Sequence, residues 1–356
     1  MKKYVTLGEV CMKGSSNIAQ KDIEQNNGSY GIYGASGYIK DVDFYQQDKP
    51  YIAVVKDGAG IGRTMLLPEK TSVIGTMQYL IPNDLVSVDY LYYAVTYMNL
   101  SKYFTGATIP HIYFKDYQKE KLPLPSIKDQ QRIAYILQKV DYLIELSKAV
   151  HNKLELLVKS RFDELFGDPK ANNKGWKMNT FANICSVRQG LQIPISKRLT
   201  LYEAGCYEYI TVAYLHGSKE REYIKNPKST VICTKDDILM TRTGNTGMVI
   251  TGVEGVFHNN FFLIDFDRKR YNKVFLTEYL NLDLIQAEIK RRAGTSTIPD
   301  LNHGEFYAIS IFEPPMELQN QFDSFVKQTD KSKYAVKKSL EKLETLKKAL
   351  MQEYFG

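Results

Sequence analysis

The sequence contains little of what metal centres and membrane anchors are built from. Its 356 residues include four cysteines and five histidines, and neither set has the short, regular spacing of metal ligands. The cysteines are therefore expected to be reduced thiols, as in a cytoplasmic protein. No apolar run reaches the roughly 18 residues that suggest a membrane-spanning helix, and residues 1–6 do not resemble a secretory leader.

The motifs of nucleotide-using enzymes are also missing. Residues 58–62 (Gly-Ala-Gly-Ile-Gly) suggest a nucleotide site, but such a site requires a following helix, which Pro68 disfavours. A tight turn between strands explains these glycines better. The Asn/Asp-Pro-Pro-Tyr/Phe motif of adenine methyltransferases is absent, and the single Pro-Pro, at residues 314–315, precedes a predicted helix. No cluster of carboxylates with a lysine indicates a nuclease.

Length and charge give weaker information. A chain of 356 residues is too long for one ordinary core, so two or more domains are expected. The net charge is +7, and residues 168–308 hold 19 basic and 15 acidic groups, or +4 of that total. A modest positive excess together with 26 tyrosines is compatible with nucleic-acid binding. A solvated surface of mixed sign explains the charge equally well.

An internal repeat organises the chain. Residues 125–133 (Pro-Ser-Ile-Lys-Asp-Gln-Gln-Arg-Ile) match residues 314–322 (Pro-Pro-Met-Glu-Leu-Gln-Asn-Gln-Phe) at an offset of 189 positions. The same offset aligns the Thr-Ile-Pro tripeptides at 108–110 and 297–299. Each half therefore has one plan, in which a variable segment is followed by Thr-Ile-Pro and a helical segment.

The helical segments of the two halves are long. Neither residues 126–166 nor residues 316–355 contain proline or glycine, and apolar residues recur in steps of four and three with polar interruptions. Pro125 and Pro315 stand where a helix start tolerates proline, and Gly167 follows the first helix as a stop. The pattern predicts an antiparallel coiled-coil pair that separates two modules. Two separately packed helices are the alternative.

Each variable segment is predicted to be an α/β module. In the first, a buried strand at Tyr51–Val55 runs into a glycine-bearing turn, and a helix follows at Val88–Met98. In the second, a strand at Asp237–Met240 runs into the turn at 241–247, and a helix follows at Leu276–Arg292. The predicted fold class is α/β (α+β) with a pseudo-twofold repeat of two globular domains and two long helices. The predicted boundaries are 1–121 for the first module, 122–167 for the first helical segment, 168–308 for the second module and 309–356 for the second helical segment.

These features together resemble the specificity subunit of type I restriction–modification systems. The resemblance rests on residues 122–133, on the helix ending near 165–169, on the stretch at 30–37 (Tyr-Gly-Ile-Tyr-Gly-Ala-Ser-Gly) and on the duplication, and it covers essentially the whole chain. The second helix entrance, at 317–321, matches the family pattern less closely than the first. The first module also lacks a tryptophan-bearing lead-in such as 175–177 (Gly-Trp-Lys).

The resemblance implies a division of labour among subunits. Each module would be a target recognition domain for one half of a split double-stranded DNA site, and the helices would set the spacing between the halves. Two methyltransferase subunits would dock around the helices, and restriction–translocase subunits would join them. The chain itself would be non-catalytic, cytoplasmic and free of cofactors. S-adenosylmethionine, ATP and Mg would be used only by the partner subunits.

The candidate contact residues lie in the turns, in the segments around Thr-Ile-Pro and at the helix entrances. Base edges are read by bidentate side chains, and phosphates are held by basic groups and backbone amides. The DNA-binding candidates are Tyr30, Tyr33, Ser36, Lys56, Arg63, Thr108, His111, Gln189, Gln192, Arg242, Thr243, Asn245, Thr295 and Thr297. The partner-binding candidates are Gln130, Gln131, Gln319 and Gln321, for which ordinary solvated glutamines are the alternative.

Two hypotheses from other functional classes remain open from the sequence. An adaptor whose helix pair assembles proteins would show no salt-dependent DNA affinity, whereas phosphate contacts make affinity fall with added salt. An enzyme with an unrecognised site in one module would turn over substrate as the isolated chain. Two diverged modules on one shared frame favour DNA recognition over both.

Overall fold

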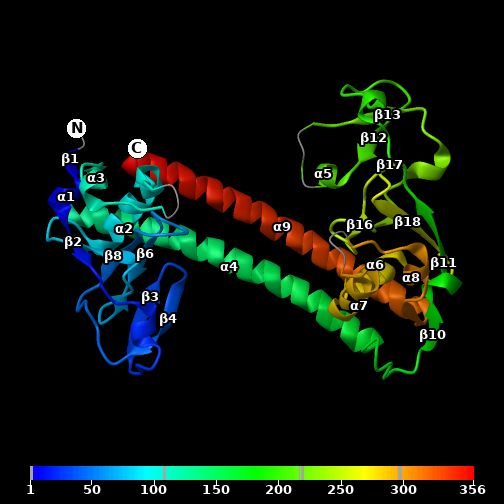
Figure 1. Ribbon diagram of the computed structural model, residues 1–356, viewed down its shortest axis with the longest axis horizontal. Helices are drawn as coiled ribbons and strands as arrows, with labels where there is room; N and C mark the ends of the chain where they lie inside the picture. Colours follow the sequence, from blue (N-terminus) through cyan, green and yellow to red (C-terminus); the bar gives the residue numbers. More distant parts are fainter. Residues whose placement is uncertain (1–2, 107–109, 216, 218–219, 296–298) are drawn as a thin grey trace. The chain divides into compact units, whose positions relative to one another are not determined.

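The computed structural model describes residues 3–106, 110–215, 217, 220–295 and 299–356. The chain divides into two compact units (Figure 1). Unit 1 contains Met1–Ala149 and Val336–Gly356, and unit 2 contains Val150–Ala335. Each unit therefore consists of one module and one part of each long helix.

Unit 1 is built on a four-stranded antiparallel sheet with the order β2-β8-β5-β6. A three-stranded sheet, β4-β3-β7, and the pair β1-β9 complete it. The strands are β1 (Tyr4–Thr6), β2 (Cys11–Ser15), β3 (Tyr30–Gly34), β4 (Gly37–Val42), β5 (Tyr51–Val55), β6 (Thr64–Leu67), β7 (Ser72–Val73), β8 (Met77–Pro82) and β9 (Lys121–Pro123). The short helices are α1 (Leu7–Val10), η1 (Gln20–Ile23), α2 (Val88–Met98), η2 (Leu100–Tyr103) and α3 (Phe114–Tyr117).

Unit 2 repeats this topology. Its main sheet has the order β11-β18-β15-β16, its second sheet has the order β13-β12-β17-β14, and β10 pairs with β19. The strands are β10 (Lys177–Thr180), β11 (Cys185–Gln189), β12 (Cys206–Ile210), β13 (Tyr223–Lys225), β14 (Ile232–Cys233), β15 (Ile238–Thr241), β16 (Val249–Thr251), β17 (Gly255–Phe257), β18 (Phe261–Phe266) and β19 (Ser310–Glu313). The short helices are η3 (Phe181–Asn183), η4 (Ile195–Lys197), α5 (Val212–Leu215), η5 (Ser229–Val231), α6 (Lys273–Asn281), α7 (Asp283–Ala293) and α8 (His303–Tyr307).

The central strand of each main sheet is its most buried element. All five residues of β5 and all four of β15 are buried, because both faces of each strand are covered. In unit 1, Ile52 and Val54 face the core beneath α2, while Tyr51, Ala53 and Val55 face a second cluster. The rigid central strand fixes where the chain leaves the sheet, and this places the turn that follows it.

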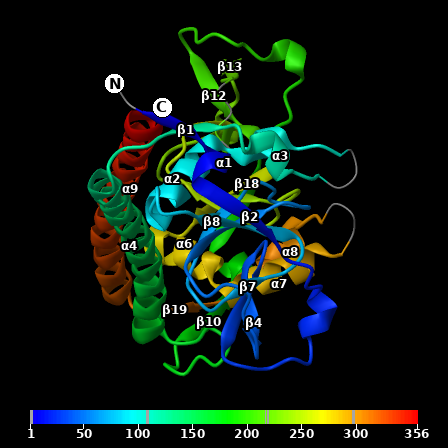
Figure 2. The ribbon, with the colours of Figure 1, turned by 90° about the vertical axis from the view of Figure 1, so that its left-hand side faces the viewer.

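The two long helices are α4 (Ile127–Phe166) and α9 (Met316–Phe355). In unit 1 the beginning of α4 lies beside the end of α9 (Figures 1 and 2), and Lys347 forms an ion pair with Asp141 at 2.5 Å. In unit 2 the end of α4 lies beside the beginning of α9, where the rings of Phe162 and Phe322 are 5.5 Å apart. The two helices therefore run antiparallel in each unit, as predicted.

Most predicted elements are confirmed. The strand at Tyr51–Val55 and the helix at Val88–Met98 have the predicted bounds. The single helix predicted at Leu276–Arg292 is wrong, because Leu282 has extended backbone (ψ 137°) and separates α6 from α7. All four cysteines are free thiols, as expected. None of the described helices is both long and apolar enough to cross a membrane.

Candidate nucleic-acid interface

A buried glutamine joins each long helix to the module before it. The Gln130 side chain accepts a hydrogen bond from the Ser87 amide at 2.9 Å and donates to the carbonyls of Leu85 (3.0 Å) and Pro125 (3.1 Å). Gln319, at the equivalent position, accepts from the Asn272 amide at 2.8 Å and donates to the carbonyls of Arg270 and Pro314. We call these two residues the glutamine clamps.

The glutamine clamps correct part of the partner-binding prediction. Gln130 and Gln319 are both fully buried, so a partner protein cannot reach their amides. These glutamines serve hydrogen bonds inside the protein and not a contact with a partner, because a buried amide must satisfy its donors and acceptor internally. Gln131 and Gln321 are exposed on the same helix entrances, and their contact with a partner stays a prediction.

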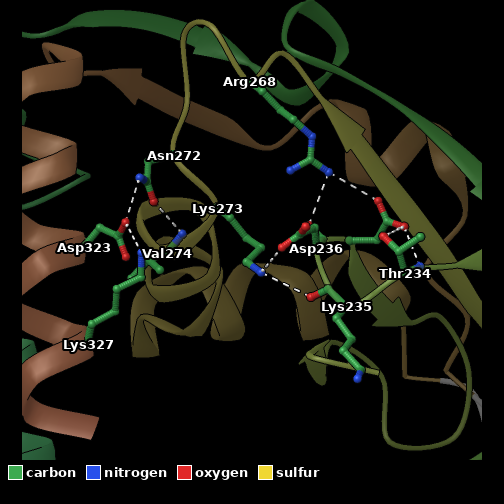
Figure 3. A network of polar contacts seen from close by, with 10 residues as sticks. Thr234, Lys235, Asp236, Arg268, Asn272, Lys273, Val274, Asp323 and Lys327 are labelled. Carbon is green, nitrogen blue, oxygen red and sulfur yellow. Dashed lines mark hydrogen bonds and ion pairs between the residues drawn. The ribbon is translucent and has the colours of Figure 1, made fainter. Parts of the chain in front are cut away.

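Asn272 extends the clamp in unit 2. Its side chain caps α6 by accepting from the Val274 amide at 2.8 Å, and it donates to Asp323 of α9 at 3.3 Å (Figure 3). On the other side of this network, Lys273 and Arg268 donate to the backbone carbonyls of Lys235 and Asp236 (Figure 3). These two cations therefore stabilise the corner between the sheet and α6.

The turn that follows each central strand occupies the same place in the two units. In unit 1 the amide of Lys56 donates to the carbonyl of Thr76 at 3.0 Å, and in unit 2 the amide of Arg242 donates to the carbonyl of Asn260 at 2.7 Å. Lys56 and Arg242 are thus equivalent residues. Both had been predicted to contact DNA, and each leads into a turn with glycines of positive φ.

In unit 1 a polar latch joins this turn to the segment around Thr-Ile-Pro. Asp57 lies 2.7 Å from His111 and forms an ion pair with Lys56. Burial opposes ionisation of Asp57, but the hydrogen bonds from Lys56 and His111 outweigh it and lower the pKa of the carboxyl. The Gly58 amide also donates to the carbonyl of Pro110 at 3.0 Å. Two predicted residues, Lys56 and His111, are therefore brought together.

The remaining candidates of module 1 surround this latch. Arg63 donates to the carbonyl of Ala35 at 3.0 Å, which places the arginine against the loop that carries the exposed Ser36. Tyr30 and Tyr33 are half-buried, and their rings pack on Tyr45 and Tyr38 at 4.9 and 5.8 Å. Part of each tyrosine ring is therefore occupied by a contact within the module. Thr108 lies outside the described residues.

A polar hollow beside the latch contains residues that the sequence reasoning missed. It has a volume of about 490 Å³, and Lys13, Lys56 and Lys115 line it together with Asn17. Lys13 lies on β2, and Lys115 lies on α3 with its ammonium 5.4 Å from the Tyr113 ring. Three lysines from distant segments suit the phosphates of a nucleic acid. Only their convergence in the fold reveals them, since no local motif joins them.

In unit 2 the acidic and basic residues of the equivalent latch are exchanged, so that the turn supplies the basic residue of the pair. Arg242 makes a bidentate ion pair with Asp300, at 2.9 and 2.6 Å, and Asp300 is the positional equivalent of His111. The pair lowers the pKa of the Asp300 carboxyl, chiefly through the hydrogen bonds from Arg242. The hydroxyl of Thr246 closes the turn, since it lies within hydrogen-bond distance of the carbonyls of Arg242 (3.1 Å) and Pro299 (3.0 Å) and can donate to either. Arg242 is thus fixed in direction by an acid of the Thr-Ile-Pro segment.

The other candidates of module 2 lie around this latch or at the end of β11. Thr243 forms a backbone bridge with Asp300, and Asn245 is exposed at the tip of the turn. Gln189 ends β11, and the next two amides donate to the carbonyls of Phe261 and Phe257, at the ends of the neighbouring strands. Gln192 and Thr295 are exposed, and Thr297 lies outside the described residues.

Several basic residues of module 2 form ion pairs within unit 2. The ion pairs are Arg198–Glu222, Lys225–Glu203, Arg242–Asp300, Arg268–Asp237, Arg270–Glu313, Lys273–Asp236 and Arg292–Glu305. Hydrogen bonds from Arg270 lower the pKa of Glu313 to about 2, against the effect of burial. Within the described ranges, no group of three or more His, Cys, Asp or Glu could hold a metal ion.

The chain is similar to known proteins. A family model described as "Type I restriction modification DNA specificity domain" matches residues 2–156 and again 173–347. The MjaIX specificity subunit of Methanocaldococcus jannaschii, described as a type I restriction enzyme subunit, is 26% identical over 282 residues, which cover 69% of this chain and 63% of that protein. The MjaVIII specificity subunit of the same organism is 25% identical over 152 residues, covering 42% of this chain and 35% of that protein.

The fold agrees with a solved structure of the same family. The S subunit of a type I restriction–modification system from M. genitalium superposes with a TM-score of 0.68 at 18% identity, covering 100% of this chain and 96% of that one. At this identity the superposition establishes the shared fold, while the family model matches two successive stretches that together cover most of the chain. The chain therefore belongs to the family of type I restriction–modification DNA specificity domains, and it carries the domain in duplicate.

Proposed function

We propose that this chain reads a two-part DNA site without catalysing a reaction, and that each module reads one half. The observation that carries the proposal is the repeated latch. In each module the turn after the central strand is held against the residue that follows the Thr-Ile-Pro sequence, and the pair that holds it differs, His111 with Asp57 in one and Arg242 with Asp300 in the other. Two modules that share one fold but differ in the residues at this turn are what the recognition of two different half-sites requires.

The long helices supply a surface for the partners. Tyr135 and Tyr142 of α4 are 59% and 62% exposed, and Leu146, one helical turn further on, is 45% exposed. These residues follow one another at intervals of seven and four, which places them on one face of the helix. Exposed aromatic residues aligned in this way are typical of protein interfaces. We therefore propose that methyltransferase subunits dock here, with Gln131 and Gln321 as further contacts.

The chemistry is assigned to those partners. Two methyltransferase subunits would supply adenine methylation with S-adenosylmethionine, and restriction–translocase subunits would supply cleavage driven by ATP and Mg. The chain would require no cofactor of its own and would act in the cytoplasm. Under this division, one non-catalytic subunit determines which DNA sequence the whole complex recognises.

Co-expression with the cognate methyltransferase subunit tests the proposal. Genomic DNA sequenced for methylated adenines is expected to show a two-part motif with a fixed gap. Exchange of residues 1–107 with those of a relative should alter one half of the motif and leave the other half unchanged. An assembled complex whose methylation pattern ignores this exchange would refute DNA reading and support the adaptor hypothesis. Turnover by the isolated chain would support the enzyme hypothesis.

A further inference from the structure

Module 2 has a polar pocket with no counterpart among the sequence-predicted sites. It has a volume of 450 Å³, and its lining includes Arg198, Tyr209, Tyr214, His258 and Asn260. Part of this lining comes from the turn at 258–260, which connects β17 with β18. The pocket therefore borders the same strand ends as the turn that follows β15.

The turn at 258–260 lies between the two predicted DNA-contact segments of module 2. Its Asn260 carbonyl accepts from the Arg242 amide at 2.7 Å. On its other side, the amide of Leu191 donates to the carbonyl of Phe257 at 3.1 Å, and Gly190 has no room for a Cβ because it approaches the His258 carbonyl too closely. A DNA duplex that contacts both Gln189 and Arg242 would therefore also meet this turn.

A hydrogen bond within the turn fixes which ring nitrogen of His258 carries the proton. Its Nδ1 accepts from the Asn260 amide at 3.1 Å, so the proton of the neutral ring is on Nε2. Burial, followed by the nearby Arg198, lowers the pKa of His258, while Glu222 opposes this shift. The neutral ring is thus a donor at Nε2 near neutral pH. It suits an acceptor on a base edge, such as guanine O6 or N7 or thymine O4.

The wall of the pocket is already rigid. Arg198 donates to both oxygens of Glu222, at 3.2 and 3.1 Å, and to the carbonyl of Ile193, at 2.9 and 2.7 Å. Its guanidinium also lies 5.0 Å from the centre of the Tyr209 ring. The Asn260 side-chain amide, by contrast, donates no hydrogen bond within the part of the chain that the structure describes. Asn260 and His258 therefore have hydrogen-bonding capacity left for a ligand.

We infer that His258 and Asn260 are specificity-determining residues that read base edges in the half-site of module 2, with Asn260 selecting an adenine. This inference rests on the function proposed above. An asparagine amide donates to N7 and accepts from N6 of adenine, a pattern that no other base offers in the major groove. The equivalent turn of module 1 is Ile74-Gly75-Thr76, in which Ile74 is buried. Module 1 therefore lacks this pair of reading groups.

The test uses the full chain in complex with its methyltransferase subunit. Affinity is measured for duplexes that carry the methylated motif, with each base pair of the module 2 half-site replaced in turn. Asn260→Ala should reduce the preference for adenine at one position by about 5- to 150-fold. Asn260→Asp should shift the preference there toward cytosine, since a carboxylate accepts from the N4 amino group. His258→Phe should relax a neighbouring position. The other half-site should stay unchanged throughout.

A matched control and the contrary outcomes separate this inference from the proposed function. Asn183→Asp makes the same chemical change on an exposed residue before β11, at the opposite end of that strand from Gln189, and should leave the motif intact. If assembled Asn260 and His258 variants keep the wild-type base preferences, the inference is wrong although DNA reading stands. If they lose affinity equally for every base, the residues are structural and the inference is also wrong. If the wild-type complex shows no two-part motif, the proposed function itself fails.

Discussion

The two modules use charge differently at the same place in the fold. Module 1 gathers Lys13, Lys56 and Lys115 around its hollow, and of these only Lys56 forms an ion pair among the described residues. Module 2 has the larger formal excess, yet its arginine at the equivalent turn is paired with Asp300. Formal charge therefore does not identify the face with more available cations, because an ion pair leaves the net charge unchanged while it occupies the basic side chain.

The frame around these turns differs much less. Both glutamine clamps make three hydrogen bonds, two to carbonyls and one from an amide. The comparison indicates that the hydrogen bonds between each module and its long helix were kept after duplication, while the turns after the central strands diverged. Four predictions test this contrast, beginning with the frame.

Removal of a glutamine clamp should have the largest effect. Gln130→Ala or Gln319→Ala leaves a buried amide and two carbonyls without their partner, and each is expected to lower the free energy of unfolding by about 2–4 kcal/mol. Urea titration followed by circular dichroism measures this loss. The exposed neighbours give matched controls, and Gln131→Ala and Gln321→Ala should stay within about 0.5 kcal/mol. Equal effects at buried and exposed positions would contradict the clamp.

The glycines of the two turns should respond unequally. Gly62 (φ +78°) and Gly247 (φ +90°) both need the left-handed region. A Cβ on Gly62 would collide with the backbone of Ser101, whereas one on Gly247 would meet the Ile289 side chain at 2.8 Å and the Gln286 side chain at 3.0 Å. Gly247→Ala should therefore cost more than the roughly 1–2 kcal/mol of left-handed strain, because the buried Ile289 must shift. Gly62→Ala should cost more still, because its clash is with backbone. Thermal unfolding of both variants checks the order.

The salt dependence of DNA binding should separate the modules. Lys13→Ala or Lys115→Ala is expected to weaken binding to all sequences and to reduce the slope of log K against log salt by about 1, as for one lost phosphate contact. Asp300→Asn should strengthen non-specific binding, since it frees Arg242. Lys49→Ala, at the opposite end of β5 from the turn, is the control. Unchanged slopes in both lysine variants would remove the hollow from the interface.

The smallest expected effect is that of pH on the module 2 half-site. The pKa of His258 is lowered, and Arg198 and Glu222 are the charged groups that face it. The unfolded chain therefore takes up the proton at higher pH than the folded chain, so this residue makes stability fall as pH drops below the ordinary histidine value of about 6.5. Unfolding measured by urea titration from pH 7 to pH 5 should show this fall in stability. His258→Phe should abolish this contribution.

The sequence predicted the frame better than the interface. The repeat and the spacing of apolar residues located α4, α9, β5 and α2 because these elements depend on local pattern. The break at Leu282 was missed because no proline or glycine marks it. Gln130 and Gln319 were assigned to partners because sequence alone cannot show which polar heptad positions are buried. Lys13, His258 and Asn260 escaped notice because each lies far along the chain from the turn that it borders.

The partners of the glutamine clamps are backbone groups, and this has an evolutionary consequence. Backbone carbonyls and amides are present at nearly every residue whatever its side chain. The clamp hydrogen bonds therefore depend on the backbone conformation of the module and not on its amino-acid sequence. A module from another protein with the same backbone conformation at the junction could form these hydrogen bonds without compensating substitutions there. A recombination event that exchanges one whole module is therefore expected to leave the junction with the long helices intact.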